Sequence, residues 1–276
     1  MKIAVVGLGL IGGSFAKAFS EQENMTLYCL DRDETTIARA RLEGAMDEVL
    51  TKDNIGECDT VIVALYPKAS EEFLREYAPF ISKDAIVIDC GGTKKGICRV
   101  GFELAEKHGF CFMGGHPMAG THFSGFKYAR ASLFSGASMI LVPKKGETIE
   151  TLQSVKNLLV MAGFKSVTVS TAEEHDKIIA FTSQLAHVVS NAYVKSPNAM
   201  VHKGFSAGSY KDLTRVAKLN PAMWAELFLE NSENITFEIE NLIAELQKYN
   251  DAIKEGNREE LEKLLAEGTK IKESIG

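Results

Sequence analysis

The sequence lacks the long apolar runs that mark membrane proteins, and its first residues do not have the pattern expected of a secretory leader. No apolar run among its 276 residues reaches the roughly 18 residues that a membrane-spanning helix needs. The apolar N-terminus, MKIAVVGLGLIGGSF, is interrupted by glycines, and no small-residue cleavage site follows it. We therefore expect a strand and a turn at the N-terminus, not a signal peptide.

Basic clusters and paired cysteines are also missing. The net charge is −6 and there is no basic cluster, which argues against nucleic acid as a main partner but leaves a small anionic substrate possible. The cysteines are five, an odd number, and none form a CxxC pair; they are Cys29, Cys58, Cys90, Cys98 and Cys111. This usage predicts free thiols in a reducing compartment and neither disulfides nor a metal site. We expect a cytoplasmic protein.

What the sequence does contain is an alternation of short apolar runs and helical patterns up to about Ser170. Continuous apolar runs are typical of strands that are covered on both faces, as in a parallel sheet. The runs are KIAVVG, TLYCLD, TVIVAL, AIVIDC, FCFMGG, SMILVP and SVTVS. The pattern predicts an α/β fold: a Rossmann-type, doubly wound sheet over residues 1–170, acting as a dinucleotide-binding domain.

The remaining residues, 171–276, predict an all-α domain. The segment 172–195 is apolar around most of its circumference, so we expect a helix buried on several sides. Asn220 and Pro221 predict the N-cap and first residue of a helix of more than 30 residues, about 45 Å long. A last amphipathic helix is expected over 257–275. Because one small domain cannot bury so long a helix, we expect a homodimer through this half.

A glycine-rich loop follows the first predicted strand. Gly7, Gly9 and Gly12 have GxGxxG spacing, which suits a tight turn, close approach of a pyrophosphate and close packing of helix on strand. Asp31 ends the next strand, nineteen residues after Gly12, where a carboxylate binds the adenosine ribose and favours NAD over NADP. Arg32 beside it is able to stack on adenine or tolerate a 2′-phosphate. The full predicted cofactor set is Gly7, Leu8, Gly9, Leu10, Ile11, Gly12, Asp31, Arg32, Ala64, Leu65 and Thr93.

A second unusual stretch, GGHPMAGTHFSG, spans residues 114–125. His116 follows the run FCFMGG, which places it at the carboxyl end of a strand, the edge where open α/β sheets bind ligands. The turn DCGGTKKG ends the preceding strand at the same edge and contains Thr93. We expect a nicotinamide ring between these two strand ends, next to His116.

The motifs GLGLIGGS, DCGGTKKG, GGHPMAGTHFSG and SYKDLTRVAKLNPAMW occur in the order and spacing of the prephenate dehydrogenase family, which includes arogenate dehydrogenases. The resemblance covers essentially the whole chain. It implies a dinucleotide domain followed by a helical dimerisation domain. It also implies NAD(P)-dependent oxidative decarboxylation of prephenate to 4-hydroxyphenylpyruvate in tyrosine biosynthesis. From the room that the chain leaves beyond these motifs, we expect a minimal, monofunctional enzyme without a regulatory or chorismate mutase segment.

The resemblance assigns roles to individual residues. His116 matches the catalytic histidine that takes the proton of the ring hydroxyl, and Arg215 matches the arginine that holds a substrate carboxylate. The spacing of Asp176, Ser183 and His187 predicts one common helix face. The predicted substrate-binding set is Arg215, His187, Ser183, Thr121, Lys211 and Trp224.

Three positions depart from the family pattern, and several functions stay open. Gly92 replaces a common serine, so Thr93 or water would take over its contact; Gln184 replaces a common histidine; and His122 replaces a common acidic residue at the pocket entrance. Prephenate and arogenate are not distinguished. The sequence is also compatible with a β-hydroxyacid dehydrogenase, relying on a lysine such as Lys195 or Lys203, and with a non-enzymatic NAD sensor.

Overall fold

The computed structural model describes residues 1–121 and 123–276, and within these ranges eight strands form one sheet. Their order is β3-β2-β1-β4-β5-β6-β7-β8. The strands are β1 (Lys2–Val6), β2 (Thr26–Leu30), β3 (Glu48–Val49), β4 (Thr60–Val63), β5 (Ile86–Asp89), β6 (Cys111–Pro117), β7 (Ser138–Pro143) and β8 (Ser166–Val169). The chain order reverses between β1 and β4, which creates the crevice where such sheets bind nucleotides.

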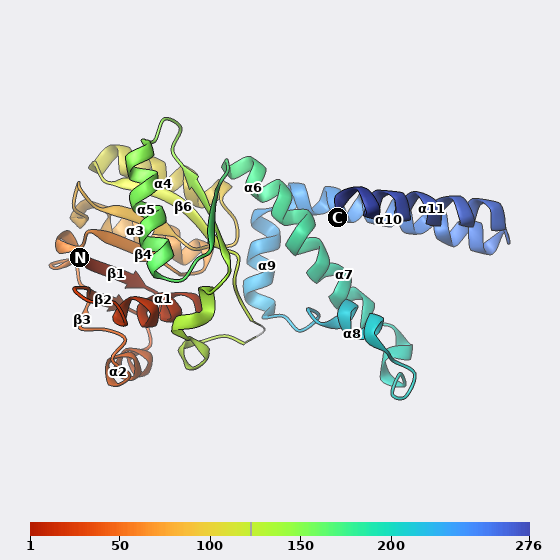
Figure 1. The fold of residues 1–276 in the computed structure, drawn as a ribbon, viewed down its shortest axis with the longest axis horizontal. Coiled ribbons are helices and arrows are strands. Elements are labelled where there is room, and N and C mark those ends of the chain that lie inside the picture. Colours follow the sequence, from red (N-terminus) through yellow and green to blue (C-terminus); the bar gives the residue numbers. More distant parts are fainter. Residues whose placement is uncertain (122) are drawn as a thin grey trace.

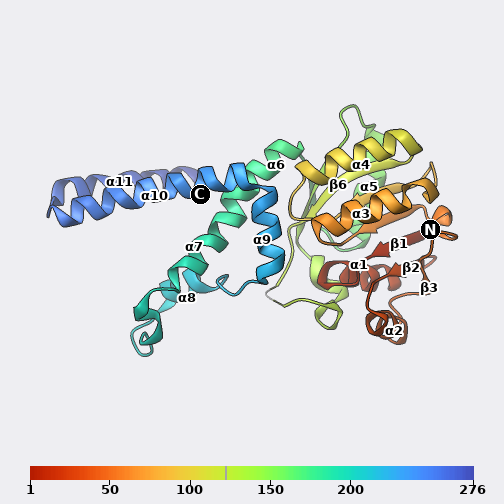
Figure 2. The same cartoon turned by 180° about the vertical axis from the view of Figure 1, so that it is seen from behind.

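Helices cover both faces of this sheet (Figures 1 and 2). One face packs against α1 (Leu10–Ser20), α2 (Glu34–Leu42) and α5 (Ile149–Met161), and the other against α3 (Pro67–Tyr77) and α4 (Lys95–His108). Along β1, Ile3 and Val5 enter the first core while Ala4 and Val6 enter the second. The predicted doubly wound α/β fold is confirmed, because the continuous apolar runs are buried on both sides.

Two details of the sheet differ from the prediction. β7 is antiparallel to β6, whereas the other paired strands are parallel. A parallel connection needs a crossover of a dozen or more residues, usually a helix, but the described residues between β6 and β7 form only short 3₁₀ turns, Phe126–Tyr128 and Ala131–Phe134. The extra strand β3 has two residues, too few to produce a recognisable apolar run.

Residues 171–276, all of which are described, form helices and turns, as expected. The first helix consists of α6 (Ala172–Ile179), a π-helical turn (Ala180–Leu185) and α7 (Ala186–Tyr193). It is followed by α8 (Gly208–Thr214), α9 (Pro221–Glu230), α10 (Ser232–Lys254) and α11 (Arg258–Ile275). This half lies beyond the carboxyl ends of the strands, and α10 and α11 form a projecting hairpin (Figure 1). In the described ranges no helix has both the length and the apolar character needed to cross a bilayer.

The single helix of more than 30 residues predicted after Asn220 is wrong. Its start is as expected, since the Asn220 side chain accepts a hydrogen bond from the amide of Met223 at 3.3 Å. The helix then breaks at Asn231, which is 3% exposed and separates α9 from α10. The Asn231 side chain donates to Asp176 O and Gln184 Oε1, both at 2.8 Å. These contacts with the first helix of the domain hold Asn231 at the bend.

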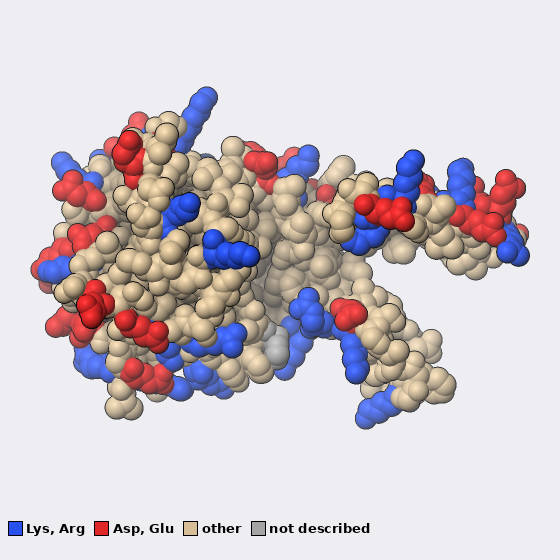
Figure 3. Space-filling model, viewed as in Figure 1, with Lys and Arg blue, Asp and Glu red and all other residues tan. Residues whose placement is uncertain are grey.

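The helix over 172–195 is less buried within one protomer than predicted. Ile178, Phe181 and Tyr193 are exposed, as are Leu246 and Ile253 on α10. Figure 3 shows side chains of both charge signs over the sheet-containing half and along the projecting hairpin, with uncharged surface between them. Exposed apolar surface of this extent needs a further partner to cover it.

Candidate active site

The glycine loop between β1 and α1 has the geometry of a phosphate-binding turn. Gly7 has φ of 87°, and a Cβ there would lie 2.6 Å from Ala64 O; a Cβ on Gly12 would lie 1.9 Å from Gly7 O. A Cβ on Gly9 would meet nothing within 4 Å, so the space beside its backbone is open. Gly9 is the N-cap of α1, whose first turn has no side-chain cap and no acidic residue. Free amides and the positive end of the helix dipole therefore face this space, which suits a phosphate.

The end of β2 adjoins this loop through Asp31. Its Oδ2 accepts a hydrogen bond from the amide of Leu8 at 2.7 Å, and its Oδ1 accepts one from the amide of Asp33 at 2.9 Å. Asp31 is partly exposed and Arg32 is exposed. Each carboxylate oxygen keeps a lone pair for a further donor, so the side chain can accept from a ribose hydroxyl. Ala64 and Leu65, on the other side of Gly7, follow β4 directly.

A buried ion pair lies under the neighbouring strand ends. Lys94 is 0% and Asp89 1% exposed, and Lys94 Nζ lies 2.5 Å from Asp89 Oδ2. Asp89 also accepts hydrogen bonds from the amides of Gly91 at 2.8 Å and Gly115 at 3.0 Å. One carboxylate thus joins the end of β5, the turn before α4 and the strand β6. This pair was not identified from the sequence, since a lysine in a turn gives no sign of full burial.

His116 is the penultimate residue of β6, at the carboxyl edge, as expected. Its Nδ1 lies 2.9 Å from Nε2 of His175, and Nδ1 of His175 lies 2.7 Å from Oδ1 of Asp176. His116 is partly exposed, whereas His175 and Asp176 are each 2% exposed. Loss of solvent, the facing His175 and the Lys94 ammonium lower the pKa of His116 well below its ordinary value of 6.5. The ring is therefore neutral at physiological pH, as a proton acceptor must be.

Three carboxylates of the helical half bind the sheet half at this edge. Asp176 accepts the amides of Lys94 and Lys95, at the start of α4, at 2.7 and 2.8 Å. Glu226 of α9 accepts the amide of Lys68 at the start of α3, at 2.8 Å. Glu230 of α9 accepts the hydroxyl of Thr93 at 2.6 Å, and partial burial raises the pKa of this carboxyl. These contacts hold α6 and α9 against the edge that contains His116.

Three of the predicted substrate-binding residues lie together in the helical half. The rings of His187 and Trp224 are 4.0 Å apart, and His187 Nδ1 donates to Val216 O at 3.1 Å. Burial lowers the pKa of His187, and the charge of Arg215 acts in the same direction. Arg215 is exposed and also lines a hollow of about 340 Å³ with Phe181, Leu213 and Leu242. Arg215 is therefore close to His187 and also borders this hollow.

The remaining predicted substrate residues are more dispersed. Lys211 lies exposed on α8, where Lys and Arg side chains gather (Figure 3), and Thr121 lies exposed in the loop after β6. Ser183 lies partly exposed in the π-helical turn. This wider turn changes the phase of the helix, so Gln184, and not Ser183, shares the buried side of Asp176.

The departures from the family pattern have structural explanations at two positions. A Cβ on Gly92 would lie 3.2 Å from Leu227 Cδ2, so a larger side chain there would press on α9. The hydroxyl proton of Thr93, the expected substitute, goes to Glu230. Gln184 is 2% exposed and donates to Leu227 O at 3.2 Å, which makes it part of the helix packing. His122 lies outside the described residues.

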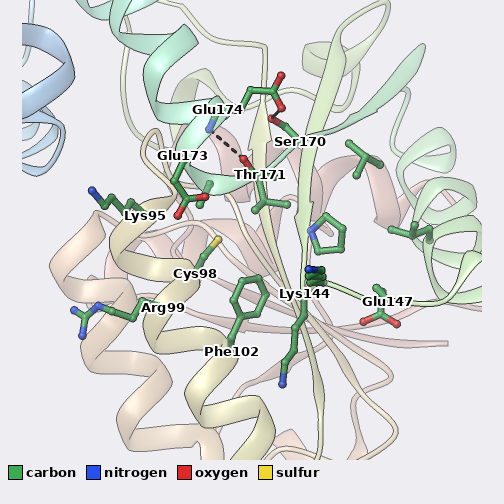
Figure 4. A pocket seen from close by; sticks show the side chains of 17 residues that line it. Lys95, Cys98, Arg99, Phe102, Lys144, Glu147, Ser170, Thr171, Glu173 and Glu174 are labelled. Atoms are coloured by element: carbon green, nitrogen blue, oxygen red, sulfur yellow. Dashed lines mark hydrogen bonds between the residues drawn. The ribbon is translucent and has the colours of Figure 1, made fainter. Parts of the chain in front are cut away.

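A larger hollow, of about 970 Å³, lies between α4, the loop after β7 and the start of α6 (Figure 4). Charged side chains of both signs line it, including Lys95, Arg99, Lys144 and Glu173. None of the predicted cofactor or substrate residues is among those that line it. The candidate site is therefore the edge formed by the glycine loop, Thr93 and His116, and not this hollow.

Sequence reasoning missed His175. Asp176 was predicted only to share a helix face with Ser183 and His187. The available signal was the adjacent His-Asp pair in AEEHD at the start of a predicted helix, but sequence alone does not show that this pair meets His116, 59 residues earlier.

Comparison with known proteins covers both halves of the chain. Residues 15–168 match the family described as prephenate dehydrogenase, nucleotide-binding domain, and residues 171–267 match prephenate dehydrogenase, dimerization domain. A prephenate dehydrogenase of Lactococcus lactis subsp. cremoris is 32% identical over 286 residues, which cover 99% of this chain and 77% of the relative.

Solved structures show the same likeness. The A. aeolicus prephenate dehydrogenase in complex with hydroxyphenyl propionate and NAD+ has a TM-score of 0.84 and 30% identity, covering 100% of this chain and 98% of that one. A Synechocystis arogenate dehydrogenase has a TM-score of 0.81 and 25% identity, covering 100% of both chains. The resemblance expected from the motifs is confirmed: the chain belongs to the prephenate dehydrogenase family.

Proposed function

We propose that this protein catalyses the NAD-dependent oxidative decarboxylation of prephenate to 4-hydroxyphenylpyruvate, a step of tyrosine biosynthesis. The observation on which this rests is the position of His116 in a member of this family. A neutral imidazole lies at the carboxyl edge of the sheet, on the same edge as an open glycine loop and opposite the helical half.

The residues around the glycine loop fit NAD. The uncapped start of α1 and the open space at Gly9 would hold the pyrophosphate, and Asp31 would accept from the ribose hydroxyls. Leu8, Leu10 and Ile11 belong to the same turn, with Arg32 at its rim. Ala64, Leu65 and Thr93 would border the nicotinamide. NAD, when bound, supplies the acceptor for the hydride that leaves the ring carbon bearing the hydroxyl.

His116 would move the proton of this reaction. As the carbinol carbon is oxidised, its hydroxyl proton passes to the neutral imidazole, because a base of low pKa is free to accept it near neutrality. Carbon dioxide leaves from the opposite ring carbon, and the electron pair of the broken C–C bond makes the ring aromatic. The phenolate oxygen then recovers a proton, so no net proton is consumed by the protein.

The helical half would hold the anionic substrate. Arg215 can bind a carboxylate through two parallel hydrogen bonds, and the rings of the neighbouring His187 and Trp224 supply an aromatic surface beside it. Ser183, Thr121 and Lys211 complete the proposed substrate-binding set.

Residues 1–170 form the dinucleotide-binding domain and residues 171–276 the substrate and dimerisation domain of a homodimer, in keeping with the match to a dimerization domain. Five free cysteines support a cytoplasmic location.

Arogenate is the second candidate substrate. It carries an amine where prephenate carries a ketone, and its oxidation would give tyrosine directly. The likeness to the Synechocystis arogenate dehydrogenase over the whole of both chains favours keeping it in view.

A substrate panel tests the proposal. The purified protein is mixed with NAD or NADP and, separately, with prephenate, arogenate or 3-hydroxyisobutyrate, and the absorbance of reduced cofactor is followed. We expect the highest kcat/KM with prephenate and NAD. A higher value with arogenate would reverse the order of the two candidates. Turnover of 3-hydroxyisobutyrate alone, or binding of NAD without turnover, would contradict the proposed reaction.

A further inference from the structure

We propose that His175 and Asp176 act as positioning residues that select the tautomer of His116, leaving its Nε2 as the proton acceptor. This inference rests on the proposed function in one respect only, that His116 is the base. The arrangement of donors and acceptors stands independently of the substrate.

The chain of hydrogen bonds begins at Asp176. Its two oxygens accept the amides of Lys94 and Lys95 at the first turn of α4, where the helix dipole favours a negative charge. A carboxylate only accepts hydrogen bonds, so the contact with Nδ1 of His175, at 2.7 Å, requires a proton on that nitrogen. In a neutral His175 the other nitrogen, Nε2, then carries a lone pair.

The same pairing of donor with acceptor determines which nitrogen of His116 carries the proton. Its Nδ1 faces Nε2 of His175 at 2.9 Å, and two lone pairs cannot form a hydrogen bond. His116 must therefore carry its proton on Nδ1 and donate it. Its Nε2 is left unprotonated. A second group that fixes the tautomer of a histidine through its other nitrogen is a common feature of histidine chemistry.

Burial protects the hydrogen bonds among His116, His175 and Asp176 from competition by water. His175 and Asp176 are each 2% exposed, so water cannot replace either partner easily. Both residues lie on α6, in the helical half, while His116 lies on β6. The ring of His116 is oriented by the opposite half of the protein, and its competent tautomer depends on contact between the two halves.

Nitrogen chemical shifts of 15N-labelled histidine test the assignment without any substrate. We expect Nδ1 of His116 to be protonated and Nε2 to be unprotonated in the wild-type protein at neutral pH, with the signals identified by their loss in His116→Asn. In His175→Phe the ring lacks an acceptor, and we expect the Nε2-protonated form of His116 to become populated. A wild-type His116 with its proton on Nε2 would overturn the proposal, whatever the enzyme's substrate.

Kinetic measurements on His175 variants distinguish a positioning role of this residue from a packing role. His175→Phe keeps an aromatic ring but no acceptor, and kcat should fall on the order of 10-fold or more with little change in KM for prephenate. His175→Gln places an amide oxygen near the former Nε2 and should recover most of this loss. His108→Phe, at the far end of α4, serves as the control and should behave as wild type.

The affinity for NAD and the melting temperature, measured for each variant, establish that it is folded. Equal losses of kcat in folded His175→Phe and His175→Gln would show that His175 only fills space, and would overturn the proposal. Absence of prephenate turnover in the wild type would instead contradict the proposed function and leave the tautomer result to stand alone.

Discussion

His116 is the residue whose environment most directly determines the chemistry. Loss of solvent lowers its pKa, and the adjacent His175 and the buried Lys94 ammonium act in the same direction. A lowered pKa means that the neutral, proton-accepting form persists below the ordinary value of 6.5 and is lost only as the pH falls through the lowered pKa.

The pH profile should show this shift. We expect the acid limb of kcat/KM, which reports the free enzyme, to lie below pH 6.5. Initial rates at low prephenate concentration across the acidic range measure it, with enzyme stability checked at each pH. An acid limb at or above 6.5 would mean that the ring is not desolvated in solution as it is here.

Arg215 should act on substrate binding and little on stability, because its side chain is exposed. Arg215→Ala should raise KM for prephenate about 10- to 100-fold, the loss of a charge-assisted hydrogen bond. Arg215→Lys should be nearly as impaired, because the charge remains but the two parallel bonds are lost.

Lys203→Ala removes an exposed cation outside the proposed site and is the matched control. KM for NAD should change little in all three variants. Unchanged substrate kinetics in Arg215→Ala, with a lower melting temperature, would make Arg215 a structural residue.

Local patterns predicted some of these residues and not others. Gly7 and Gly12 were predictable from their GxGxxG spacing. Gly7 has a positive φ, which disfavours a side chain, and a Cβ on Gly12 would lie 1.9 Å from Gly7 O. His175 and Lys94 were not, because their roles depend on partners brought together by the fold. Arg215 was named from the family motif, but its place beside a second hollow emerges only in the structure.

Apolar runs predicted seven of the strands, and Asn220 with Pro221 predicted the start of α9. The bend between α9 and α10 was unpredictable, because Asn231 is held by residues 55 and 47 positions away in the sequence. β7 runs antiparallel to β6 because the described residues between them form no crossover helix.

The bend between α9 and α10 should contribute to the free energy of unfolding. Asn231→Ala removes the donors to Asp176 O and Gln184 Oε1, leaving two acceptors without this partner at a buried site. We expect the free energy of unfolding to fall by about 2–4 kcal/mol. Urea denaturation at one fixed protein concentration measures it, with the exposed Asn250→Ala as the control. A change equal to that of the control would show that the bend is set by other contacts.

At the level of the whole protein, a single protomer leaves apolar side chains of the helical half exposed to solvent. Leu246 and Ile253, seven residues apart on α10, are 58% and 64% exposed, and residues 171–267 match a dimerization domain. Residues at this spacing lie on one helix face, so they form part of an apolar surface that a second copy would cover.

Charges on this face should prevent assembly. We expect the double variant Leu246→Glu, Ile253→Glu to be a monomer by light scattering at concentrations where the wild type is a dimer, because burying two carboxylates is costly. Lys270→Glu, which changes charge at an exposed position of α11, should remain dimeric. A dimeric double variant would place the interface on another face.

The decisive measurement compares wild type with His116→Asn using NAD and prephenate. If His116 is the base, the variant should bind NAD with unchanged affinity and remain folded and dimeric, while kcat falls on the order of 100-fold or more. The wild type should release carbon dioxide and form reduced cofactor in equal amounts. Near-normal turnover by a folded His116→Asn would remove His116 from the mechanism and contradict the reaction assigned to this site.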